Sequence, residues 1–299
     1  MDKHMDKHMN ENTALANCLG EWSQSANIRA LRGVYENANP FPHVVLDPFF
    51  RPEYALELAR AFPTPSVTAT SPAWHKYDNP LEKKYALNQF ENLPLFQSLF
   101  ALLQSDEVVD VFKTLTGIAD LENDPFLHGA GLHYHDREGK LDMHLDYSVH
   151  PVSGKERRLN LIVYLNEDWN DAFNGGLELW DSDFTRACAT IMPSFNKAVV
   201  FQTSDISYHG VPRPIACPPE RGMGRKSLAI YYLSPLRENV NATHRIKAQF
   251  RPLPHQPVSP ALQRLYDIRP SRTLTEKDLT GFEPSWREDP IGNGFWYLS

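Results

Sequence analysis

The feature that most constrains the fold of this chain is a series of short β-type segments between Phe126 and Leu233. The segments richest in β-branched and aromatic residues are Arg158–Leu165, Ala198–Phe201 and Ser227–Leu233. Turn signals that contain Gly, Pro and Asn separate the segments. Many short strands punctuated in this way are typical of a β-sandwich or a jelly-roll barrel. The sequence therefore predicts a mainly β core.

The chain before this core has a mostly helical pattern, over residues 21–117. Pro52–Phe62 and Leu95–Leu103 carry apolar residues at helical spacing. Ser105 is a typical N-cap for a further helix that runs to Leu115. We expect these helices to support the β core.

Three other segments differ from their surroundings. His43–Leu46 is strand-like, whereas the polar, turn-rich Ser66–Asn88 is predicted to be a long loop. After Pro235 the chain is rich in proline and arginine, and we predict an irregular extension that is a candidate lid. The chain then divides into a tail that is disordered or left by cloning (1–20), a helical support region (21–121), the β core (122–236) and the C-terminal extension (237–299).

Composition excludes several classes of function. The 299 residues carry a net charge of −7, so no basic face for nucleic acid is expected. No apolar run approaches the ~18 residues of a membrane span, and no signal-peptide pattern opens the chain. The 3 cysteines form no C-x-x-C pair, which favours a reducing, cytoplasmic location over a disulfide scaffold. The sequence does not indicate an oligomeric state.

Two histidines and one aspartate form a candidate metal site. His144 and Asp146 lie two positions apart in a strand-like segment, where alternate side chains point to one face. His209 precedes a turn and can arrive from a separate strand. Two imidazoles and one carboxylate can hold one face of an Fe(II) octahedron and leave positions open for a co-substrate and dioxygen. Since the chain has 12 histidines, three rivals stay open: His133, His135 and His150.

A candidate anion site follows at the start of a predicted strand. With period-two alternation Arg225 and Ser227 share a face, while Lys226 points away. A guanidinium fork beside a hydroxyl can bind a carboxylate through charge-assisted hydrogen bonds. An ordinary surface arginine at a strand start is the alternative interpretation.

Six segments of the chain occur together in an order that is specific as a combination. They are HLD (144–146), RRLNLIVYLNEDW (157–169), GGLELWD (175–181), PSFNKAVVF (193–201), YHGV (208–211) and GRKSLAIYY (224–232). Together they resemble the catalytic core of the Fe(II)/2-oxoglutarate-dependent dioxygenases, in the prolyl-4-hydroxylase-like branch. The resemblance implies a mainly β (α+β) fold with a double-stranded β-helix (jelly-roll) core and supporting N-terminal helices.

The resemblance also implies an activity and its site residues. Fe(II), 2-oxoglutarate and O2 would be required, ascorbate would be a candidate stimulant, and succinate and CO2 would be released. A carboxylate at position 146 favours hydroxylation over halogenation, because related halogenases leave that place free for chloride. The implied iron ligands are His144, Asp146 and His209, and the implied co-substrate ligands are Arg225, Ser227, Tyr134, Asn160 and Tyr164. Core packing is an equal interpretation of Tyr164.

The substrate is less constrained than the cofactors. The branch that the chain resembles modifies prolyl residues in proteins, free amino acids and their derivatives, and other metabolites. From this we expect an amino-acid-like unit, free, derivatised or peptidyl (for example prolyl). Several further polar or aromatic residues are candidates for substrate contact, although a structural role is favoured for each: His133, His135, Asp142, Tyr147, Trp180 and Arg158.

Two other classes of function stay open. A cupin-like, non-oxidative metal enzyme such as a zinc hydrolase can use the same three ligands, but it leaves Arg225 and Ser227 unexplained. A non-catalytic jelly-roll binding module would have ordinary histidines at these positions, and metal would not change its stability.

Overall fold

The computed structural model describes residues 17–65, 72–237, 245–283 and 297–298. Of the predicted tail (1–20), residues 1–16 therefore lie outside the described residues. The helices are η1 (Glu21–Ser23), α2 (Ser25–Glu36), α3 (Pro52–Ala61), α4 (Pro94–Leu103), α5 (Asp106–Thr116), η2 (Asp171–Phe173), η3 (Pro219–Arg221), α6 (Pro260–Ile268) and η4 (Glu276–Leu279). The strands are β1 (His43–Leu46), β2 (His75–Asn79), β3 (Glu82–Leu87), β4 (Gly131–His135), β5 (Lys140–Leu145), β6 (Glu156–Tyr164), β7 (Leu177–Trp180), β8 (Ala187–Ile191), β9 (Ala198–Gln202), β10 (His209–Val211), β11 (Arg225–Ser234), β12 (Gln249–Phe250), β13 (Phe282–Glu283) and β14 (Tyr297–Leu298).

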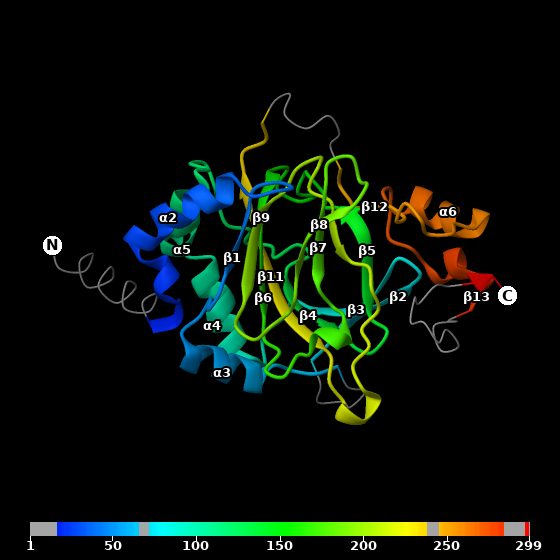
Figure 1. Cartoon of the computed structure of the whole chain (residues 1–299), viewed down its shortest axis with the longest axis horizontal. Coiled ribbons are helices and arrows are strands. Elements are labelled where there is room, and N and C mark those ends of the chain that lie inside the picture. The colour runs from blue at the N-terminus through cyan, green and yellow to red at the C-terminus, as the bar shows by residue number, and fades with distance from the viewer. Residues whose placement is uncertain (1–16, 66–71, 238–244, 284–296, 299) are drawn as a thin grey trace.

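The main strands form a jelly roll of two antiparallel sheets. One sheet has the order β1-β9-β6-β11-β4 and the other β5-β10-β7-β8, and β3 joins them by pairing with both β4 and β5. Apolar residues from both sheets form a core between them, among them Tyr164, Leu177, Val199 and Val211. Figure 1 shows the N-terminal helices gathered on one side of the strands and α6 on the other side. The predicted double-stranded β-helix core is confirmed.

Alternation along β11 lets one strand serve two environments. Leu228, Ile230 and Tyr232 pack with the N-terminal helices in the largest hydrophobic core. Arg225 and Ser227 point the other way, into the space between the sheets. The predicted helical support therefore covers the outer face of the β11 sheet, while the inner face stays available for polar groups.

The predicted helices are present within one or two residues of their expected ends. The Ser105 side chain caps α5 by accepting a hydrogen bond from the Val108 backbone N–H at 3.4 Å. Gly117 ends the helix with a φ of 74°, a left-handed conformation that glycine adopts without a Cβ clash. No described helix is long and apolar enough to cross a lipid bilayer.

The prediction of a long loop over Ser66–Asn88 was wrong for its second half. The structure has a β-hairpin there, in which β2 pairs with β3 and β3 extends the sheets. Asn79 holds the turn, since its side-chain oxygen accepts hydrogen bonds from the backbone N–H groups of Leu81 (3.0 Å) and Glu82 (3.2 Å). The strands carry polar residues because one face of the hairpin lines a cavity, so they lack the usual apolar alternation.

The prediction of an irregular C-terminal extension was also wrong in part. Ser259 caps α6 by accepting from the Leu262 N–H, and α6 packs through Leu265 and Tyr266 in a small separate core. Phe250, in β12, belongs to the same core and pairs with β5. We call residues 245–279 the C-terminal arm.

A buried ion pair joins the hairpin to the C-terminal arm. The Arg269 guanidinium donates to the Glu82 carboxylate from Nε at 3.2 Å and from Nη2 at 3.1 Å. Lys84 lies beside the same carboxylate, with Nζ 3.7 Å from Oε2. Burial alone would raise the pKa of the Glu82 carboxyl, but Lys84 and Arg269 outweigh it and hold that pKa below its usual value.

Glu82→Gln is expected to lower the free energy of unfolding by about 3 kcal/mol, because two buried cations lose their counter-charge. The exposed Glu91→Gln is the control and should change it by less than about 0.5 kcal/mol. Since the folded-state pKa of Glu82 is lowered, its stabilisation is complete above the unfolded value of about 4.3 and is lost as the pH falls through the folded value. Urea denaturation at neutral and acidic pH measures both effects, and equal stability of the two variants at neutral pH would contradict the prediction.

Candidate metal centre and carboxylate site

The three predicted metal ligands meet at one place between the sheets. His144 is the penultimate residue of β5, Asp146 follows directly after the strand, and His209 begins β10 opposite His144 in the pairing register. The Asp146 carboxylate lies 3.6 Å from His144 Nε2 and 3.4 Å from His209 Nε2. One donor atom from each residue lies within 4.8 Å of the other two, and all three residues are buried. This donor set fits a ferrous ion bound on one face.

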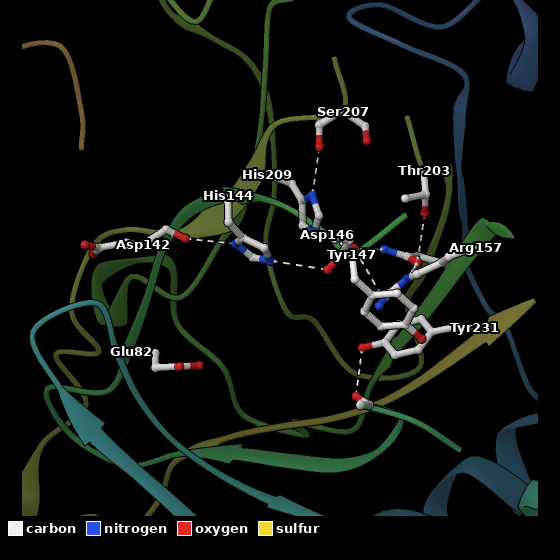
Figure 2. Close-up of polar contacts among 12 residues, drawn as sticks. Glu82, Asp142, His144, Asp146, Tyr147, Arg157, Thr203, Ser207, His209 and Tyr231 are labelled. Carbon is white, nitrogen blue, oxygen red and sulfur yellow. Dashed lines mark hydrogen bonds and ion pairs between the residues drawn. The ribbon is translucent and has the colours of Figure 1, made fainter. Parts of the chain in front are cut away.

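Backbone carbonyls fix the orientation of both imidazoles. His144 Nδ1 lies 2.9 Å from the Asp142 carbonyl oxygen, and His209 Nδ1 lies 2.9 Å from the Ser207 carbonyl oxygen. Figure 2 shows the opposite edges of both rings turned toward Asp146. An Nδ1–H that donates to a carbonyl leaves the Nε2 lone pair free, which is the tautomer that a metal ligand needs.

The Asp146 carboxylate is held by two neighbours that sequence reasoning did not assign to it. Asn160 Nδ2 donates to Asp146 Oδ2 at 2.7 Å, and Arg157 Nη2 lies 3.0 Å from the same oxygen. The Arg157 guanidinium lies over the rings of Tyr231 (3.3 Å to the centroid) and Tyr147 (4.6 Å). Burial would raise the pKa of the Asp146 carboxyl, but Arg157 and the two histidines hold it well below its usual value. The carboxylate is therefore fixed in place and ionised, and Figure 2 shows it between Arg157 and the two histidines.

Arg225 lies in the same cavity, which has a volume of about 500 Å³ and is also lined by the metal triad. Its Nε donates to the Gly175 carbonyl at 2.8 Å and its Nη1 to Ser227 Oγ at 3.2 Å. The side chain is buried, and this burial lowers the pKa of the guanidinium. Among the described residues no carboxylate forms an ion pair with Arg225. A buried guanidinium without a protein counter-ion is suited to an anionic ligand.

The three additional co-substrate candidates have different positions. Asn160 lines the cavity but contacts Asp146. Tyr164 is fully buried in the core between the sheets, with its ring 4.9 Å from the Arg225 guanidinium. Tyr134 does not line the cavity: it lies on the outer face of β4 and packs against Trp74 and Tyr85. The structure thus does not support a co-substrate role for Tyr134, because alternation points its side chain away from the site.

The rival histidines do not form a metal site among the described residues. His133 and His135 line the cavity on the inner face of β4, and burial lowers the pKa of His133 to about 3 and that of His135 well below its usual value. His150 lies elsewhere, 3.3 Å from the buried carboxylate of Asp124. The two cavity histidines are therefore neutral wall residues.

The remaining candidates for substrate contact mostly have structural roles, as expected from the sequence. Trp180 stacks on Phe184, and Arg158 donates to Ser234 away from the cavity. Asp142 accepts from Tyr266 at 2.7 Å and so connects β5 to the C-terminal arm. Tyr147 differs from the others because it lines the cavity.

Sequence reasoning missed a group of residues that line the outer part of the cavity. The hairpin and the C-terminal arm supply these residues, and neither segment carries a recognisable motif. The residues are Tyr77, Glu82, Lys84, Lys247, Phe250 and Arg269. Phe250 stacks on the candidate metal ligand His144, with ring centroids 5.1 Å apart. The signal for them in the sequence is the alternation Glu82, Lys84, Ala86, which lies in a polar segment typical of a loop.

Comparisons with known proteins give a family match for the β core and similar solved structures. Residues 130–234 match the sequence model of the 2OG-Fe(II) oxygenase superfamily. A prolyl hydroxylase from Trichoplax adhaerens, solved with a hypoxia-inducible-factor oxygen degradation domain peptide fragment, is similar with a TM-score of 0.50 and 14% identity, over 72% of this chain and 94% of that chain. A Pseudomonas putida prolyl-4-hydroxylase has a TM-score of 0.45 and 15% identity, over 69% of this chain and 99% of that one. The sequence search among curated proteins gave no match. The Trichoplax likeness supports the jelly-roll fold.

Proposed function

We propose, from the premise that residues 130–234 form a domain of the 2OG-Fe(II) oxygenase superfamily, that this chain hydroxylates an amino-acid-like substrate, free, derivatised or peptidyl. The family match over residues 130–234 supports the expectation of an iron- and 2-oxoglutarate-dependent enzyme. In the proposal His144, Asp146 and His209 bind Fe(II), and Arg225 with Ser227 binds the distal carboxylate of 2-oxoglutarate.

One observation carries the assignment of the site. The buried guanidinium of Arg225, which has no carboxylate partner among the described residues, shares its cavity with the three clustered donors. A dicarboxylic keto acid can reach both places at once, with one end at the metal and the other at the guanidinium. A simple metal hydrolase needs the triad but has no use for the buried cation.

The residues of the chain would perform three tasks. The iron and 2-oxoglutarate supply the oxidising chemistry, in which O2 is consumed and succinate and CO2 are released. Arg225 fixes the direction of the co-substrate through charge-assisted hydrogen bonds. Arg157 and Asn160 keep the Asp146 carboxylate in one orientation, and the backbone carbonyls of Asp142 and Ser207 orient the two imidazoles.

The proposal is tested by succinate release from 2-oxoglutarate with a panel of free amino acids, N-acetyl amino acids and peptides that include prolyl units. At least one member should raise succinate release above the background without substrate, and mass spectrometry should find the same product with one added oxygen. His144→Ala is the blank for every member, since it lacks a ligand. If no member exceeds that blank, the amino-acid-like substrate class is wrong.

Metal and co-substrate binding test the alternatives separately from turnover. Addition of 2-oxoglutarate to the anaerobic Fe(II) protein should produce a weak visible charge-transfer band, which a zinc hydrolase would not give. Mn(II) should raise the melting temperature by mass action. An unchanged melting temperature would instead favour a binding module without a metal.

A further inference from the structure

The outer half of the cavity has an excess of positive charge that the proposed chemistry does not use. Among the described residues, two anionic side chains line the whole cavity, Glu82 and Asp146. In the same part of the chain five cationic side chains line it: Lys84, Arg157, Arg225, Lys247 and Arg269. A ferrous ion and the 2-oxoglutarate dianion cancel each other in charge, so their binding leaves the excess in place. We propose that this excess binds an anionic oxygen group of the primary substrate, a carboxylate or a phosphate, with Lys84 as its main ligand.

The ion pairs within the cavity leave Lys84 less compensated than Arg157 and Arg269, while Arg225 is assigned to 2-oxoglutarate by the proposed function. Arg157 is paired with Asp146 at 3.0 Å, and Arg269 donates two hydrogen bonds to Glu82. Lys84 Nζ approaches Glu82 only to 3.7 Å, which is longer than a hydrogen bond. The single charge of Glu82 is thus shared by two cations.

The backbone geometry directs Lys84 into the cavity. Along β3, Glu82, Lys84 and Ala86 line the cavity, while Lys83 points to the other face and pairs with Glu138 at 3.3 Å. The Lys84 side chain is 15% exposed. Burial lowers the pKa of its amino group, which agrees with a cation whose charge the protein compensates only in part.

The position of Lys84 fits a contact with substrate rather than with the metal ligands. Lys84 comes from the hairpin, and Lys247 and Arg269 come from the C-terminal arm, so all three lie outside residues 130–234 of the matched domain. Both segments lie beside β5, because β3 and β12 pair with it (Figure 1), and Phe250 of β12 stacks on His144. The inference rests on the proposed function, because it assigns specificity to that same site.

The test is calorimetric binding to the full chain loaded with Mn(II) and 2-oxoglutarate, without turnover. The probes are N-acetyl derivatives of proline, leucine, glutamine and serine, each as free acid and as amide, together with N-acetyl-O-phosphoserine amide. An anionic form should bind about tenfold or more tightly than its neutral amide, since charge-assisted hydrogen bonds have this strength. Preference for the acids identifies a carboxylate, and preference for the phosphoserine amide identifies a phosphate.

Lys84→Met should reduce the preference for the anion to less than about twofold, while Lys84→Arg retains it. Lys83→Met is the matched control: it removes the same charge from the same strand on the opposite face and should retain the full preference. Lys84→Met should fold, because the Glu82–Arg269 pair remains balanced. Equal binding of every acid, amide and phosphorylated probe, or no binding of any, overturns the inference.

The affinity for 2-oxoglutarate separates this inference from the proposed function. If the unmodified chain does not bind 2-oxoglutarate, the proposed function has failed. If it does, and Lys84→Met weakens 2-oxoglutarate binding as much as it weakens the acid probe, then Lys84 is part of the co-substrate site and the inference is wrong.

Discussion

His209→Ala is expected to lower Mn(II) and Fe(II) affinity by at least about 100-fold and to abolish turnover. Loss of a residue that only supports a metal ligand costs about 10- to 100-fold in affinity, so loss of a ligand costs at least the upper value. In the unmodified chain, Mn(II) at 100 times its dissociation constant should stabilise the fold by about 2.7 kcal/mol. In the variant this stabilisation should fall to about 0.4 kcal/mol or less at the same concentration.

The readout is the difference in melting temperature with and without Mn(II), which is insensitive to a general loss of stability. His209 is buried and packs edge-on against Phe201 at 4.7 Å, so the variant should also melt lower without metal. His255→Ala removes an exposed histidine and should retain the full metal-dependent shift. An undiminished shift in His209→Ala would exclude His209 as a ligand.

Arg225→Met is expected to weaken 2-oxoglutarate binding roughly 100-fold, which corresponds to about 3 kcal/mol. The substitution removes the charge-assisted hydrogen bonds to the distal carboxylate but keeps most of the side-chain volume. Mn(II) affinity without 2-oxoglutarate should not change, because the triad is untouched. Titration of the anaerobic Fe(II) protein with 2-oxoglutarate, followed by the visible band, measures the dissociation constant.

The stability of Arg225→Met without ligands provides a second and independent outcome. A buried cation without a protein counter-ion is costly, so the variant should be no less stable than the unmodified chain. Lys226→Met is the control, because Lys226 lies on the opposite face of β11 and should leave 2-oxoglutarate binding unchanged. A change in 2-oxoglutarate affinity of less than about threefold in Arg225→Met would refute the anchor assignment.

Much of the candidate metal and carboxylate site could be predicted, because its residues lie on or next to regular strands. Period-two alternation was enough to place Arg225 and Ser227 on one face and to bring His144 and Asp146 together. The same rule argues against Tyr134, whose odd-numbered neighbours His133 and His135 line the cavity. That candidate came from family resemblance rather than from alternation, and this is why it is not supported.

The outer part of the cavity could not be predicted, because the positions of its residues depend on pairings between distant segments. The hairpin reads as a loop until β3 is seen to pair with β4 and β5. Arg157 gives no local signal, since its partner Asp146 and the ring of Tyr231 come from other strands. Arg269 meets Glu82 across 187 positions of sequence.

The amino-acid sequence by itself determined the β core, its helical support, the candidate metal donors and the shared face of Arg225 and Ser227, because strand alternation and helix capping act over a few residues. Only the tertiary structure decided which residues cover the metal centre and what charge surrounds it. The physical reason is that burial and ion pairing are set by long-range contacts. Whether an arginine or lysine has a carboxylate partner is decided only after distant strands have brought its neighbours into place.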